Sequence, residues 1–233
     1  MLKRATFAVL LPALVLTVAG CTGDDDGGDG DGGEDLAGRL SAAQTVLDDA
    51  QSLELDLTTP ELPSGTTGLL EAKGTGTHAP AFEGDVKVSL KGVPINAEVV
   101  SVDGTVHAKT GFSPTFLPLD PASIGAPDPA TLMRSDDGIS SLLTETDDLK
   151  SGGESRDGRD VLTTITGTIE GAVIRGLIPT AQADTTFDAT YRLTEDDVLR
   201  DVTLEGLFYA GDEPVTYTVA VTASDDPVEI TAP

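Results

Sequence analysis

Side chains able to do chemistry are few in this chain. Its 233 residues include one Cys, Cys21, and two His, His78 and His107, and no Trp. A single Cys excludes an intramolecular disulfide and a cysteine-rich zinc site. Catalysis or ligand binding must therefore depend on the two histidines, on carboxylates, or on apolar surface.

The two histidines are the candidates for acid–base or nucleophilic catalysis. The members of a Ser-His-Asp triad come from distant positions, so a hydrolase that uses His78 or His107 stays open. The chain has no G-x-S-x-G elbow and no H-E-x-x-H motif. With 40 acidic residues, pairs of Asp and Glu single out no catalytic site. We expect both histidines to lie at the surface, and we expect no enzymatic activity, no cofactor and no metal site.

Cys21 stands in a specific chemical context. It follows Val18-Ala19-Gly20, and before these lie the basic pair Lys3-Arg4 and an apolar segment, residues 5–19. As a helix this segment would span roughly 22 Å, too short for a hydrocarbon core of about 30 Å. Small residues before a Cys match the bacterial lipobox, in which the thiol receives a diacylglycerol. We therefore expect residues 1–20 to be a lipoprotein signal peptide. Cys21, carrying two or three acyl chains such as palmitate, would anchor the protein to the extracytoplasmic face of the cell membrane.

The charge of the chain limits its partners. The formal net charge is −26, which repels the phosphates of nucleic acids and argues against binding them. The segment 21–35 follows the expected lipobox and holds almost only Gly, Asp and Glu after Cys21. Such a segment stays solvated, so we expect an acidic tether. A calcium site is the alternative, but the spacing of an EF-hand loop is missing.

Hydrophobic periodicity predicts a helix followed by strands. A stripe with spacings of three and four residues predicts a helix over residues 36–52. From Leu53 onward, apolar and polar residues alternate, and Asp103-Gly104 is typical of a hairpin turn. Residues 111–150 contain five prolines, so we expect a lid of short helices there, with Asp128 and Asp137 as caps. Strands return from Val161, around a helix at 170–178, and end with a closing strand at 228–231. The pattern predicts one α+β domain over residues 36–233 with a large antiparallel sheet.

The alternating strands predict an apolar face that mixes large and small side chains. Gly and Ala on this face leave room, and few helices are available to cover it, so it can enclose a lipid-sized cavity. The candidate cavity residues on strands are Phe82, Val86, Val88, Leu90, Ile95, Ala97 and Val99. The candidate cover residues are Leu132, Met133, Leu142, Leu143, Leu177 and Ile178. Ordinary core packing is the alternative for each of them.

Several segments, in this order and spacing, resemble those of a known family. They are Ala81–Leu90, Val102–Lys109, Pro127–Ala130, Gly138–Leu143 and Pro227–Pro233. Together with the lipobox they resemble the LppX/LprAFG family of actinobacterial lipoproteins, over nearly all of residues 36–233. The long acidic segment and the strong negative charge depart from the family pattern.

The resemblance implies a fold and a function. The fold would be a curved antiparallel half-barrel wrapped round a few helices, similar to the Lol lipoprotein carriers, enclosing an apolar cavity. The function would be binding of acylated lipids or lipoglycans and their transport toward the outer cell envelope. The implied partners are the acylated lipid or glycolipid, the membrane through the anchor, and an exporter of the major facilitator type. The alternative is a tethered envelope scaffold that binds a partner without a lipid cavity. Sensing of a lipid, in place of transport, also stays open.

Overall fold

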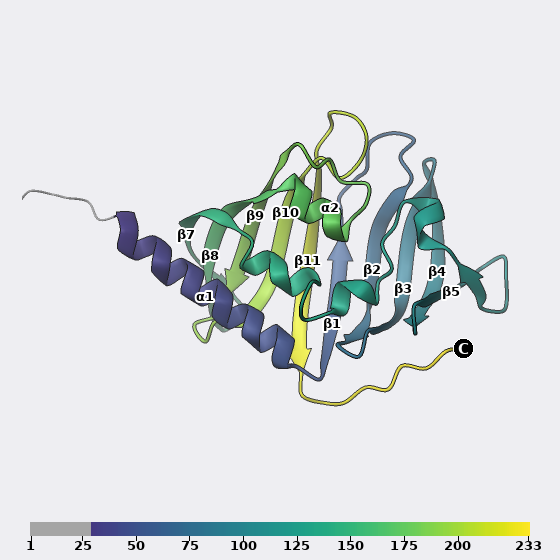
Figure 1. Cartoon of the computed structure of the whole chain (residues 1–233), viewed down its shortest axis with the longest axis horizontal. Helices are drawn as coiled ribbons and strands as arrows, with labels where there is room; N and C mark the ends of the chain where they lie inside the picture. The colour runs from purple at the N-terminus through teal and green to yellow at the C-terminus, as the bar shows by residue number, and fades with distance from the viewer. Residues whose placement is uncertain (1–28) are drawn as a thin grey trace, which may run out of the picture.

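An eleven-stranded antiparallel sheet is the frame of the structure, a computed structural model that describes residues 29–233 (Figure 1). The strand order is β6-β5-β4-β3-β2-β1-β11-β10-β9-β8-β7. The bounds are β1 Ser52–Thr58, β2 Gly68–Thr77, β3 Ala81–Leu90, β4 Val93–Val102, β5 Thr105–Thr110, β6 Leu117–Leu119, β7 Asp147–Asp157, β8 Asp160–Glu170, β9 Thr186–Leu193, β10 Leu199–Gly206 and β11 Val215–Ser224. The sheet therefore consists of two meanders, β1–β6 and β7–β11, joined where β1 pairs with β11.

Tight turns hold the first meander in register. Lys91-Gly92 joins β3 to β4 with φ of 52° and 87°, and Asp103-Gly104 joins β4 to β5 with φ of 54° and 70°. Positive φ at both central residues gives the turn twist that matches the twist of paired strands. The hairpin predicted at Asp103-Gly104 is confirmed by the pairing of Val102 with Thr105.

The helices all lie on one face of the sheet, which we call the inner face (Figure 1). They are α1 (Asp29–Asp49), α2 (Gly171–Leu177) and the short 3-10 helices η1 (Pro121–Ile124), η2 (Thr131–Met133) and η3 (Ile139–Leu143). The long helix α1 runs obliquely across the β7–β11 half, η3 lies beside it, and α2 lies beyond η3 (Figure 1). No helix within residues 29–233 has the length and apolar character needed to cross a bilayer.

The main hydrophobic core lies between α1, α2, η3 and strands β8–β11. Leu40 and Ala43 of α1 are fully buried there, as are Ile165 of β8 and Tyr191 of β9. The α+β fold with a large antiparallel sheet, as predicted, is confirmed. Hydrogen bonds from Arg39 also connect α1 to the β9–β10 turn. Arg39 Nε donates to Asp197 Oδ1 at 2.5 Å, and its Nη2 donates to the Thr194 carbonyl at 2.9 Å.

Four local predictions differ from the structure. The first helix begins at Asp29, inside the expected tether. The proline-rich segment contains the edge strand β6, where Pro118 is tolerated because an edge strand need not pair on both sides. Gly138 precedes η3 in place of a capping Asp137, whose carboxylate pairs with Arg134 at 2.8 Å. Residues 228–231 form no strand; Ile230 alone is buried there and fixes the C-terminal segment.

Candidate functional site

The inner face of the β1–β5 half carries a continuous apolar surface. Cross-strand register brings Ala72 of β2, Val86 of β3 and Ala97 of β4 into one row, and Val88 lies directly opposite Ile95. Directly paired residues project on the same side of a sheet. The alternation in the sequence therefore places these side chains together on the side that bears the helices.

The two halves of the inner face differ in how well they are covered. In the β8–β11 half, Ile165, Ile169, Phe187 and Tyr191 are all 0% exposed. In the β1–β5 half, eight apolar residues are only half-buried. We call these eight residues the open face: Leu55, Leu57, Ala72, Val86, Val88, Leu90, Ile95 and Ala97. Leu55 and Leu57 also pack against the main core, and Val202, Val219 and Ala223 of β10 and β11 are half-buried too. The inner face thus changes from a closed core over β8 and β9 to more accessible apolar surface over β2–β4.

The predicted strand residues fall into two groups. Val86, Val88, Leu90, Ile95 and Ala97 lie on the open face. Phe82 and Val99 share the inner face by register but are buried, at 4% and 6% exposure. These two therefore form the closed floor below the open face, nearer to η2.

The predicted cover residues lie mostly over the other half. Leu142 and Leu143 of η3 belong to the main core, and Leu177 and Ile178 pack against it. Met133 of η2 is buried, and Leu132 beside it is half-buried. The helices that carry these residues leave the open face only partly covered.

Glycines on β2 and β3 allow close contacts that a larger side chain would block. A Cβ on Gly76 would lie 2.2 Å from Met133 Sδ, so the methionine fills the space above this glycine. Gly74 and Gly84 pair across β2 and β3, and a Cβ on Gly84 would lie 2.3 Å from the Lys73 carbonyl oxygen. The backbones approach too closely for a side chain, as expected where a strand bends. The predicted room at Gly76 is thus occupied by the protein itself.

Two hollows stand out in the described part of the chain, and neither is an enclosed apolar cavity. One, of about 620 Å³, is on the outer, polar face of β1–β5. Its walls include the ion pairs Lys87–Glu71 at 2.8 Å and Lys109–Glu98 at 2.9 Å. The other, of about 420 Å³, lies between the C-terminal segment and the β2–β3 and β4–β5 turns. Exposed ion pairs of this kind contribute little to stability.

His78 is half-buried in the turn after β2, and its ring contacts two other elements, which the sequence did not predict. Its Nδ1 lies 2.6 Å from the Met133 carbonyl oxygen and its Nε2 lies 2.9 Å from the Leu47 carbonyl oxygen. The ring thus joins the turn after β2 to η2 and to the last turn of α1. A neutral imidazole carries one N–H, so the ring donates to one of these carbonyls at a time. Both nitrogens face backbone carbonyls and not a nucleophile or a carboxylate.

His107 lies on the outer face of β5, paired with Val100 and Pro118, as the alternation predicted. It is half-buried, and its Nδ1 has no hydrogen-bond partner among residues 29–233. The same residues contain no cluster of three His, Cys, Asp or Glu side chains placed to hold a metal ion. The described chain thus offers no assembled catalytic constellation around either histidine.

We expect His78→Ala to lower the free energy of unfolding by about 1–3 kcal/mol, because the carbonyls of Leu47 in α1 and Met133 in η2 lose the ring N–H that they share. Urea denaturation followed by far-ultraviolet circular dichroism measures the change. His107→Ala is the matched control and should change stability by less than about 0.5 kcal/mol. If both variants lost the same free energy of unfolding, the contacts of His78 with α1 and η2 would not stabilise the fold.

Sequence reasoning missed part of the open face. Leu55, Leu57 and Ala72 belong to it, although only β3 and β4 residues were proposed as its strands. The signal was present, since Leu53, Leu55 and Leu57 alternate with polar residues in the same way.

Sequence reasoning also missed a closed ring of hydrogen bonds between Tyr209, Tyr217 and the backbone of Leu69. This ring connects β2 to β11 beyond the end of β1. No local sequence pattern predicts a contact between residues so distant in sequence.

The comparisons with known proteins agree with this architecture. The structure is similar to the crystal structure of LprF from Mycobacterium bovis, with a TM-score of 0.69 and 17% identity, covering 86% of this chain and 97% of that one. It is also similar to the lipoprotein LppX from Mycobacterium tuberculosis, with a TM-score of 0.56 and 17% identity, covering 85% and 99%. The comparison with curated protein sequences finds no match. The family model of the LppX_LprAFG lipoproteins matches residues 35–231. The chain belongs to the LppX_LprAFG lipoprotein family.

Proposed function

We propose that this protein is a membrane-anchored lipoprotein that binds the acyl chains of a lipid or lipoglycan and carries them toward the outer cell envelope. The observation that carries the proposal is the difference between the two halves of the inner face. A sheet that needed this surface only for stability would cover it, as it does over β8 and β9. Each methylene removed from water contributes about 0.8 kcal/mol, so an acyl chain on the open face would be held firmly.

The anchor belongs to the same proposal. Residues 1–20 would be removed as a signal peptide and Cys21 acylated, which places the protein on the extracytoplasmic face; both lie outside the described residues. With membrane attachment supplied by lipid, the strongly acidic surface keeps a loaded carrier soluble. An exporter of the major facilitator type is the proposed loading partner. Family membership supports a carrier over an enzyme.

The direct test is mass spectrometry of lipids extracted from the protein after native purification from its host. We expect an acylated lipid in about equimolar amount. Protein that is free of lipid, and that also takes up no fluorescent fatty acid, would contradict carriage and favour the tethered scaffold.

We expect Ala97→Trp to reduce bound lipid strongly, because the indole would occupy the centre of the open face. Asn96→Trp is the matched control, since Asn96 is exposed on the outer face of the same strand. Circular dichroism establishes that both variants are folded before lipid is quantified. Equal lipid retention in the two variants would show that the acyl chain lies elsewhere.

A further inference from the structure

The end of the sheet beyond the open face carries the most exposed large apolar side chains. Phe112 is 89% exposed, Val93 60% and Leu117 54%. Val93 begins β4, Leu117 begins β6, and Phe112 lies just after β5, so antiparallel pairing brings all three to the same end of the sheet. We call residues 111–116, between β5 and β6, the Phe112 loop. It projects from the side of the molecule farthest from the start of α1 (Figure 1).

The Phe112 loop is held in one shape by its own backbone. Ser113 N donates to the Thr110 carbonyl at 3.0 Å, and Phe112 N donates to Thr110 Oγ1 at 3.3 Å. The ammonium of Lys109 lies 5.7 Å from the centre of the Phe116 ring. A single exposed apolar side chain is ordinary, but Phe112, Val93 and Leu117 are exposed together at one end of the sheet, and grouped exposure of this kind points to an interaction site.

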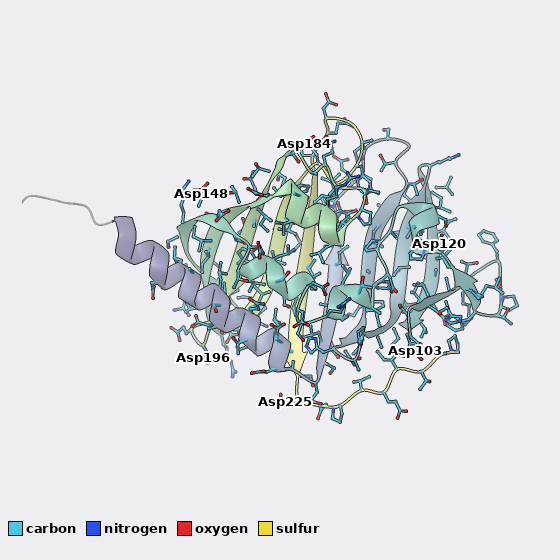
Figure 2. All side chains as sticks on the ribbon, in the orientation of Figure 1. Asp103, Asp120, Asp148, Asp184, Asp196 and Asp225 are labelled. Carbon is cyan, nitrogen blue, oxygen red and sulfur yellow. The ribbon has the colours of Figure 1, made fainter. Side chains whose placement is uncertain are left out.

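The charge of this end differs from that of the whole protein. Residues 91–97 and 110–119, which surround these three side chains, contain Lys91 and no Asp or Glu, in a chain with a formal net charge of −26. The nearby Lys87 and Lys109 are paired with Glu71 and Glu98. Of the aspartates labelled in Figure 2, Asp148, Asp184, Asp196 and Asp225 lie around the rest of the molecular outline, while Asp103 and Asp120 lie on the β4–β6 side. An acidic protein approaches lipid headgroups most easily where its own acids are absent, and a lysine beside apolar side chains suits the phosphate level of a bilayer.

We propose that the Phe112 loop, with Val93 and Leu117, is a bilayer-docking surface through which acyl chains pass between the membrane and the open face. Phe112 enters the headgroup–acyl boundary, and Lys91, exposed in the β3–β4 turn, lies at the level of the phosphates. Val93 and Leu117 share the inner face with Ile95 and Val88, so an acyl chain leaving the bilayer moves along apolar side chains throughout. This inference rests on the proposed function for its purpose, but its evidence is the separate exposure and charge of this end.

A tryptophan reporter tests the docking surface, because the chain contains no Trp. Phe112→Trp is introduced into the full-length protein, which is purified from membranes and incorporated into phosphatidylcholine vesicles with brominated acyl chains. We expect its fluorescence to shift to the blue and to be quenched by the bromines. The matched control is Val198→Trp, 36% exposed in the β9–β10 turn next to Asp197, which pairs with α1. It should be neither shifted nor quenched, although it lies on the α1 side.

The outcomes separate this inference from the proposed function. Equal fluorescence of the two reporters, in protein that still contains equimolar lipid, overturns docking and leaves carriage intact. A blue shift of Phe112→Trp that depends on protein concentration without vesicles overturns docking in favour of a second copy on this surface. Selective quenching supports docking, and Phe112→Asp should then slow transfer of a fluorescent fatty acid to vesicles by about tenfold or more.

Discussion

Ile165→Ala is expected to lower the free energy of unfolding by about 2–5 kcal/mol, while Ile95→Ala should lower it by less than about 1 kcal/mol. Both isoleucines point to the inner face of the same sheet, Ile165 from β8 and Ile95 from β4. Ile165 is 0% exposed in the main core, whereas Ile95 is half-buried on the open face. The lost methyl groups leave a cavity in the first case and only a wider opening in the second. Urea denaturation of lipid-free protein measures both values.

The same pair separates stability from binding. Ile95→Ala should reduce the affinity for a fluorescent fatty acid, because it removes apolar contact from the open face. Ile165→Ala should leave that affinity unchanged wherever the protein is folded. If the two variants lose similar stability, then the open face is an ordinary part of the core and the proposed carriage loses its structural basis.

The period-two alternation was sufficient to identify which side of each strand faces inward. The pairs Val86 with Ala97 and Val88 with Ile95 follow directly from it, because cross-strand partners share a face. Alternation says nothing about what lies above that face. The difference between Phe82, which is buried, and Val86, which is half-buried, depends on where η2 and α1 lie. Such positions are set by tertiary packing, and no periodic pattern within β3 encodes them.

Polar residues in irregular segments were the least predictable. His78 precedes Ala79-Pro80 and has the local features of a surface turn, yet its ring bridges two carbonyls from α1 and η2. The contact exists because the end of α1 passes over the β2–β3 turn, which is a result of the whole topology. The open face therefore could be predicted in outline from its strands, whereas its boundary required the structure.

Alkaline pH is expected to unfold this protein steeply through its three tyrosines, Tyr191, Tyr209 and Tyr217. Burial raises the pKa of Tyr191 to about 12, and the hydrogen bond with Thr146 offsets part of this increase. Burial also raises the pKa of Tyr209 and that of Tyr217. In the unfolded chain these phenols lose their protons near pH 10, so between pH 10 and pH 12 the folded state binds more protons. Raising the pH through this window therefore favours unfolding, at about 1.4 kcal/mol per pH unit for each tyrosine held protonated.

Absorbance at the phenolate band follows this titration directly, since the chain has three Tyr and no Trp. Native protein at pH 10.5 should show little phenolate, whereas protein unfolded in guanidinium should be more than half ionised at that pH. Tyr191→Phe should shift the alkaline unfolding midpoint upward, because it removes a proton that the folded state must retain. It also removes the phenol that lies 2.7 Å from Thr146 Oγ1, so its stability at pH 7 should fall modestly. Phenolate forming near pH 10 in folded protein would show that the tyrosines are accessible to water and that the packing between β2 and β11 is looser than described.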